Sequence, residues 1–141
     1  MKKTIITDIT ILRKVSTEAM PDEINAIIKD LEDSLDLSKG IGLSAIQIGI
    51  PKRVAIIRIG DIKLTLINTC IIEKWGRFKF IGEGCLSLPD LHIDTARYNR
   101  IKININNQIE EYTGLLAVAI QHEIGHWNGK TILDYKWKAR A

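Results

Sequence analysis

Four segments rich in β-branched residues constrain the fold of this chain more than any other feature. They are VAIIRI from Val54, KLTLIN from Lys63, RFKFI from Arg77 and IKININ from Ile101. Each is bounded by Gly, Asn or Asp, which is typical of short strands. The Gly60-Asp61 and Asn106-Asn107 pairs favour hairpin turns. Because parallel neighbours need long crossover connections, short strands with tight turns predict antiparallel sheets.

Two segments with helical periodicity flank these strands. Between Pro21 and Leu35, Ile and Leu residues recur at intervals of three and four, and Pro21 suits a first helical turn. This pattern predicts an N-terminal amphipathic helix. A second helix is expected from Gly114 to about Trp127, with Thr113 as its N-cap. The prediction is one α+β domain over residues 1–141, with antiparallel sheets packed around the C-terminal helix.

The composition excludes several classes of protein. A chain of 141 residues with 45% hydrophobic and 26% charged residues is ordinary for a globular domain and argues against disorder. The net charge is +3 and the basic residues are scattered along the sequence, so no direct nucleic-acid binding is expected. Polar residues interrupt the apolar start, and no run approaches the roughly 18 apolar residues of a membrane helix. We therefore expect no membrane partner and a cytoplasmic protein.

The segment QHEIGHW, from Gln121 to Trp127, lies in the second predicted helix. His122 and His126 are four residues apart, so a helix directs both imidazoles to one side, where they can bind one metal ion. Glu123 adjoins the first histidine, as the general base of a metal hydrolase does. The alternative is that two histidines at this spacing serve only packing or capping.

A metal centre of this kind needs a third protein ligand. Cys85 lies in EGCLSLP, which glycines and Pro89 predict to be a constrained loop, and its thiolate could complete the site. The alternative is that Cys85 is a buried small hydrophobic residue, which is the role expected of Cys70. In a reducing compartment, a disulfide between the two cysteines is disfavoured.

The segment GIGLSAIQIGIPK, from Gly40, is expected to be a loop whose glycines permit unusual backbone angles or the close approach of another chain. It lacks the third glycine of a dinucleotide-binding loop and the GK[ST] of a phosphate loop. Gln47 within it offers a side-chain amide that can donate to a developing oxyanion.

Taken together, GIGLSAIQ, EGCLSLP and QHEIGH resemble, in order and separation, the three signature motifs of the peptide deformylases. The resemblance extends over nearly the whole chain. It implies a metal-dependent hydrolase that removes the formyl group from N-terminal methionine and releases formate. It also implies a short form without the C-terminal extension of many bacterial members, such as bacteriophages encode, acting in a bacterial or phage-infected cell.

The resemblance also implies the roles of individual residues. The metal ligands would be Cys85, His122 and His126. Glu123 would act as general base, while Gln47 and the backbone N–H of Leu86 would hold the formyl oxygen. The peptide backbone would pair near Gly40, Gly42 and Gly84. The methionine pocket would be lined by Ile41, Ile81, Leu115, Val118 and Ala119, all of them apolar.

The same resemblance sets expectations for cofactor and partners. Fe²⁺ is expected in the cell, with Zn²⁺ or Ni²⁺ able to substitute. The partners would be formyl-methionyl chain ends, bound by a monomer, and ribosome attachment is in doubt because the usual C-terminal extension is missing. A catalytically silent relative that binds peptide N-termini, or a zinc peptidase, is the alternative.

Two residues depart from the family pattern. Ser44 stands where relatives have Ala, and Gly125 where they usually have Asp. That carboxylate is expected to pair in relatives with a basic residue such as Arg97, and losing a group of this kind can weaken a metal site by about tenfold or more.

Overall fold

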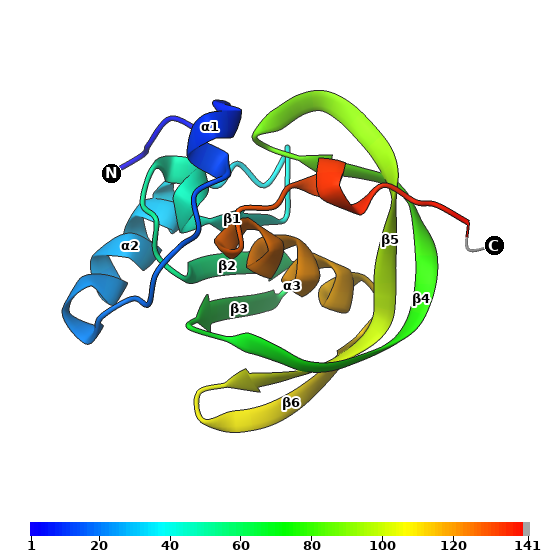
Figure 1. Ribbon diagram of the computed structural model, residues 1–141. Helices are drawn as coiled ribbons and strands as arrows, with labels where there is room; N and C mark the ends of the chain where they lie inside the picture. Colours follow the sequence, from blue (N-terminus) through cyan, green and yellow to red (C-terminus); the bar gives the residue numbers. More distant parts are fainter. Residues whose placement is uncertain (140–141) are drawn as a thin grey trace.

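Two antiparallel sheets frame residues 1–139, the part of the chain described by this computed structural model (Figure 1). The smaller sheet has the order β1–β2–β3, and the larger one the order β4–β5–β6. Helix α3 lies between the two sheets and contacts strands of both, whereas α2 packs on the other side of the smaller sheet. The predicted α+β class is confirmed.

The smaller sheet consists of β1 (Gly42–Ser44), β2 (Val54–Ile59) and β3 (Ile62–Ile67). The predicted hairpin between β2 and β3 is present, and Gly60 turns it with a φ of 55°. The prediction of a loop from Gly40 is wrong in part, because the segment forms β1 and then the 3₁₀ helix η1 (Ala45–Ile48). Pairing with β2, which lies further along the chain, makes this segment a strand.

The larger sheet is dominated by one long hairpin. It consists of β4 (Cys70–Cys85), β5 (Leu88–Ile105) and β6 (Gln108–Thr113), so RFKFI and IKININ are parts of longer strands than predicted. Asn106 and Asn107 both have positive φ, of 51° and 61°, as their hairpin turn requires. EGCLSLP, predicted as a constrained loop, spans the tight connection from β4 to β5, with register shifts before it and, between Gly84 and Cys85, within it.

The helices are α1 (Ile9–Leu12), α2 (Pro21–Ser34), α3 (Gly114–Trp127) and the 3₁₀ helix η2 (Ile132–Tyr135). The predicted amphipathic helix is therefore α2, which buries Ile27 and Leu31. The second predicted helix is α3, and Thr113 occupies its N-cap, but the Thr113 side chain makes no capping hydrogen bond.

Strand β2 joins two hydrophobic clusters. Ala55 and Ile57 face the cluster around α3, whereas Val54 and Ile56 face the cluster beneath α2. Successive side chains of a strand point to opposite faces, so a strand buried on both faces must be apolar throughout. This explains the unbroken VAII run, and it fixes the distance between α2 and α3.

The surface corrects one sequence-based prediction. Cys70 was expected in the core, but it is exposed at the start of β4.

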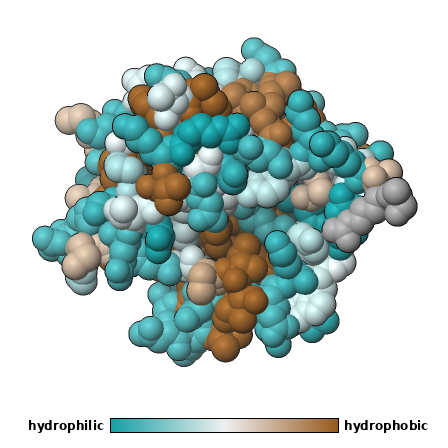
Figure 2. Space-filling model, viewed as in Figure 1, coloured by the Kyte–Doolittle hydropathy of each residue, from teal (hydrophilic) through white to brown (hydrophobic). Residues whose placement is uncertain are grey.

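On the face shown in Figure 2, hydrophobic side chains gather in patches at the top and in a band over β3 and β6. None of the helices within residues 1–139 is long and apolar enough to cross a membrane.

Candidate metal centre

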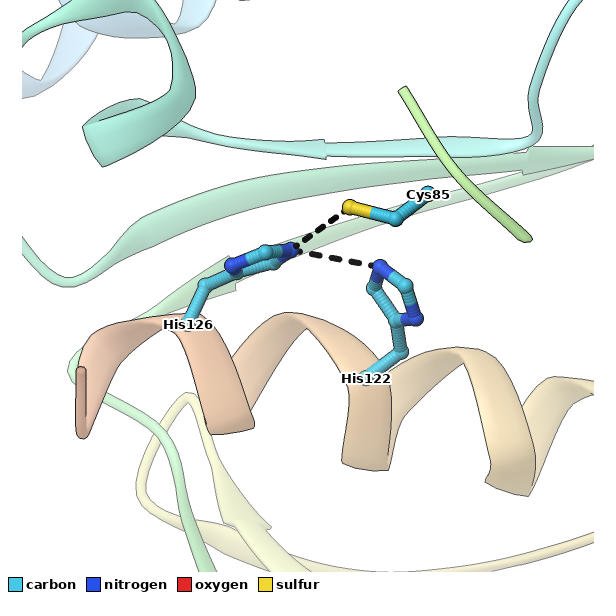
Figure 3. A group of neighbouring side chains, drawn as sticks. All are labelled: Cys85, His122 and His126. Atoms are coloured by element: carbon cyan, nitrogen blue, oxygen red, sulfur yellow. Dashed lines mark hydrogen bonds between the residues drawn. The ribbon is translucent and has the colours of Figure 1, made fainter. Parts of the chain in front are cut away.

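Helix α3 carries the two histidines of QHEIGHW on one side, as their spacing predicted (Figure 3). The helix is buried over most of its circumference, so its polar residues Gln121, Glu123 and His126 are held inside the protein. Gln121 is fixed by the backbone of Tyr98, to which it donates at 2.7 Å and from which it accepts at 2.9 Å. These two hydrogen bonds hold α3 against β5 of the larger sheet.

The side chain of Cys85 meets the two histidines from the end of β4. Its Sγ lies 3.5 Å from Nε2 of His126, and that nitrogen lies 3.2 Å from Nε2 of His122. The three candidate ligand atoms all lie within 4.8 Å of one another. One thiolate and two imidazoles at this spacing form a donor set that fits a transition-metal ion with a position left for substrate.

Glu83, two residues before Cys85, orients the first histidine. Nδ1 of His122 donates to its carboxylate at 2.7 Å, which leaves Nε2 of His122 directed at the other two ligand atoms. Arg97 donates to both oxygens of Glu83, at 2.7 and 2.5 Å, and Thr95 adds a hydroxyl bond at 2.7 Å. Arg97 and Glu83 are only 2% and 5% exposed, so this pair is buried.

The pKa values of the cluster follow from burial and charge. Burial disfavours the ionised form of Glu83, but the hydrogen bonds from His122 and Arg97 outweigh it and lower its pKa to about 2. Burial also disfavours the imidazolium of His122, yet Glu123, Cys85 and Glu83 outweigh it and raise the pKa of His122 to about 10. A bound cation would displace that proton, because metal ligands must be deprotonated.

The second histidine has the opposite shift. Burial, followed by the positive charges of His122 and Arg97, places the pKa of His126 well below its ordinary value. His126 is therefore neutral, as a ligand must be. Its Nδ1 is buried and, among residues 1–139, finds no hydrogen-bond partner. The first histidine is thus oriented by a carboxylate and the second is held by packing.

Glu123 lies beside the cluster and against β1. The hydroxyl of Ser44 contacts its carboxylate at 3.1 Å and its backbone carbonyl at 3.0 Å. Burial raises the pKa of Glu123. A Cβ added to Gly42 would lie 2.5 Å from Oε2 of Glu123, so the glycine is needed for this close approach. Ser44, which departs from the family pattern, thus acts on the candidate base.

Gln47 reaches the cluster from η1. Its amide nitrogen lies 3.7 Å from Sγ of Cys85 and donates to the Ser87 hydroxyl at 3.1 Å, while its carbonyl oxygen accepts from the backbone of Ser44 at 2.9 Å. These contacts orient the amide nitrogen toward the metal ligands. Leu86 lies in the turn that follows Cys85, and its side chain packs against Gly40.

A cavity of about 1030 Å³ leads to the cluster and is lined by Cys85, His122 and Glu123. The other predicted substrate-binding residues that line it are Gly40, Ile41, Gly42, Gly84, Leu115, Val118 and Ala119. Ile81 does not line it, and its side chain is 68% exposed. Its neighbours Phe80 and Gly82 line the cavity instead, at the place where a register shift interrupts β4.

The comparison with known families decides the classification. A family model described as polypeptide deformylase matches residues 2–140. The chain belongs to the peptide deformylase family. This family consists of metal-dependent hydrolases that remove N-formyl groups from nascent peptides. The candidate metal site of this deformylase is the group formed by Cys85, His122 and His126.

Individual relatives agree with this classification. A peptide deformylase of Brachyspira hyodysenteriae is 38% identical over 138 residues, which cover 87% of this chain and 74% of that protein. The crystal structure of the Thermotoga maritima peptide deformylase matches with a TM-score of 0.88 and 28% identity, over 98% of this chain and 99% of that one. A Synechococcus elongatus peptide deformylase in complex with actinonin matches with a TM-score of 0.85 and 29% identity, over 97% and 79%.

The structure adds residues that the motifs did not reveal. Although position 125 has no carboxylate, Arg97 is not left unpaired, because it forms a salt bridge with Glu83. The signal in the sequence was the Glu of EGCLSLP, an acidic residue two positions before a predicted ligand. When such a carboxylate is buried, it needs a cation and a hydrogen-bond donor beside it. Tyr135 places its ring 4.6 Å below the Arg97 guanidinium and 3.4 Å from a Cβ added to Gly125.

Proposed function

We propose that this deformylase hydrolyses the formyl amide of N-terminal formyl-methionine, with the metal ion held by Cys85, His122 and His126. The observation that carries the proposal is the convergence of these three donor atoms, within 4.8 Å of one another, at the end of a cavity that Glu123 also lines. Bound there, the metal would polarise the formyl group and lower the pKa of water.

The protein's own residues would move the proton and hold the charge. Glu123 has a raised pKa, which suits a group that first accepts a proton from water and then gives it to the leaving amine. The amide nitrogen of Gln47 and the backbone N–H of Leu86 would stabilise the formyl oxygen as it becomes negative. The reaction breaks the formyl C–N bond, so formate and a free amine are released.

The methionine side chain would lie among apolar residues of the same cavity. Leu115, Val118 and Ala119 are on the turns of α3 that precede His122, and Ile41 lies opposite on the segment before β1. These side chains present the apolar surface that an unbranched thioether side chain needs. Ile81 is left out of this set because it does not line the cavity.

We propose Fe²⁺ as the metal in the cell, with Zn²⁺ or Ni²⁺ able to replace it. One thiolate and two imidazoles accept all three ions, so metal availability decides which one is bound. We also propose that the chain acts as a monomer in the cytoplasm, on chain ends delivered by the ribosome. A zinc peptidase of the HExxH kind is disfavoured because its third ligand would be His or Glu rather than Cys85.

The test uses protein purified anaerobically and loaded with Fe²⁺. Release of formate from formyl-Met-Ala-Ser is measured beside cleavage of the internal peptide bonds. Formate without internal cleavage is expected. Glu123→Ala should retain stoichiometric metal and lose formate release by at least about a hundredfold. Undiminished release would exclude Glu123 as the base, and a fully loaded wild-type protein that releases no formate would show a silent relative.

A further inference from the structure

A basic rim, made of Lys2, Lys3 and Lys39, lies in the cavity that leads to the metal ligands. Asp36 of the cavity lining lies near Lys2 and Lys39, and Asp30 of α2 lies near Lys3. The carboxylate of Asp36 is occupied by Ser38, whose backbone N–H and hydroxyl donate to it at 3.0 and 2.6 Å. Asp90 is the second exposed aspartate of the lining, while Glu83 and Glu123 are buried, so the three lysines exceed the exposed aspartates of the lining by one positive charge.

The basic rim is held in place by the fold. Lys3 donates its backbone N–H to the Ser34 hydroxyl of α2 at 2.8 Å. Ile6 donates its backbone N–H to the Gln47 carbonyl of η1 at 2.7 Å. The N-terminal segment, dark blue in Figure 1, therefore runs beside the end of α2. Lysines 37 residues apart in sequence are brought to one cavity in this way.

The direction of a bound peptide follows from β1. This strand pairs with β2 on one side only, so its other edge can accept an added strand. The reacting end of the peptide must lie at Glu123, which contacts Ser44 and approaches Gly42. From there the cavity lining continues backward along the chain through Ile41 and Gly40 to Lys39.

The spacing of an extended peptide gives the position that reaches the basic rim. Lys39 lies in a turn three residues before Gly42, so it is at most about 11 Å from Gly42. An extended peptide rises about 3.3 Å per residue, so its third and fourth residues lie about 7–10 Å from its first. A peptide whose formyl-methionine lies beside Gly42 therefore brings its third and fourth residues to the basic rim. We propose that Lys2, Lys3 and Lys39 make this enzyme prefer formyl-methionyl peptides with acidic residues at the third and fourth positions.

This inference rests on the proposed deformylase function and adds its substrate class. The lysine side chains are exposed or half-buried, so each attraction is partly screened by water and salt. We expect a preference of about three- to tenfold in kcat/KM at low salt for an acidic over a basic peptide. The preference should appear in KM, because the charges act on binding and lie far from the reacting atoms.

The experiment compares three peptides, formyl-Met-Ala-Asp-Asp, formyl-Met-Ala-Ser-Ser and formyl-Met-Ala-Lys-Lys, with the Fe²⁺ enzyme at low and high salt. The acidic peptide should have the lowest KM, at similar kcat, and added salt should bring the three KM values together. Equal kcat/KM for the three peptides at low salt would overturn the preference and leave the deformylase function intact. Failure to release formate from any of them would overturn the function itself.

Charge-reversal variants test whether the basic rim causes the preference for acidic peptides. Lys39→Glu, alone and with Lys2→Glu, should abolish or reverse the order of the KM values. The matched control is Lys14→Glu, an exposed lysine that does not line this cavity, which should keep the wild-type order. Thermal unfolding verifies that each variant is folded. A preference that persists in the double variant would place its origin elsewhere and refute the assignment.

Discussion

Replacement of Glu83 with glutamine should destabilise the protein strongly and weaken its metal site. The substitution keeps the size of the side chain and one carbonyl oxygen, but it removes the negative charge. Arg97, which is 2% exposed and donates to both oxygens of Glu83, would then be a buried cation without its carboxylate. His122 would lose the charged acceptor of its Nδ1 at the same time.

The magnitude can be worked out in two ways. The pKa of Glu83 is lowered from 4.5 to about 2, and a difference of this size corresponds to about 3 kcal/mol of stability for the ionised group. Removing one partner of a buried ion pair costs about 3–5 kcal/mol. The two values agree, so Glu83→Gln should lower the free energy of unfolding by about 3 kcal/mol at neutral pH.

The pH dependence has a defined sign. Because the folded pKa of Glu83 lies below its unfolded value, its contribution is fully present above about pH 5 and is lost as the pH falls toward 2. Urea unfolding of the metal-free protein should therefore show a difference between wild type and Glu83→Gln that shrinks between pH 5 and pH 2. Half-lives of the bound metal under a competing chelator should also shorten by about ten- to a hundredfold.

A matched control separates a buried pair from an exposed one. Glu111 contributes much less to stability than Glu83, because its salt bridge with Arg100 at 2.8 Å joins side chains that are 38% and 52% exposed. Glu111→Gln should therefore leave the unfolding curve and the metal half-life nearly unchanged. If Glu83→Gln behaved like Glu111→Gln, or if its effect did not shrink in acid, the account of the Arg97 pair would be wrong.

Substitutions at three further positions should have distinct effects. Gly42→Ala would place a Cβ 2.5 Å from the Glu123 carboxylate, so formate release should fall about a hundredfold at unchanged metal content. Ser44→Ala removes a hydrogen bond that lowers the pKa of Glu123, and the acid limb of kcat/KM against pH should move to higher pH. Tyr135→Leu removes the ring beneath Arg97 and should cost about 1–2 kcal/mol in urea unfolding, whereas Tyr135→Phe should cost less.

The elements that local pattern determines were predictable from the sequence. Helices α2 and α3 and the β2–β3 hairpin follow from apolar spacing and turn residues, and they are present within a residue or two of the expected bounds. The extent of β4 and β5 was not predictable, because most residues of β4 are exposed and show no apolar alternation. Their pairing with each other makes them strands.

The candidate site was predictable as far as its residues lie in motifs. Cys85, His122 and His126 could be named from spacing and resemblance, and the structure brings them together. Glu83 and Arg97 could not be paired, since 14 residues separate them and a tertiary contact joins them. Cys70 was predicted to lie in the core because strand-like residues flank it, but it is the first residue of an edge strand and is exposed.

Position 125 lies beside the ring of Tyr135, which contacts Arg97. Without a carboxylate at position 125, Arg97 still has both oxygens of Glu83, so its charge is balanced and His122 is oriented. His126 has no such support: its Nδ1 is buried and unpartnered among the described residues. It is held instead by packing and by the contacts of its Nε2 with Cys85 and His122. The departure from the family pattern should therefore leave the Glu83 network, the orientation of His122 and the base Glu123 unaffected.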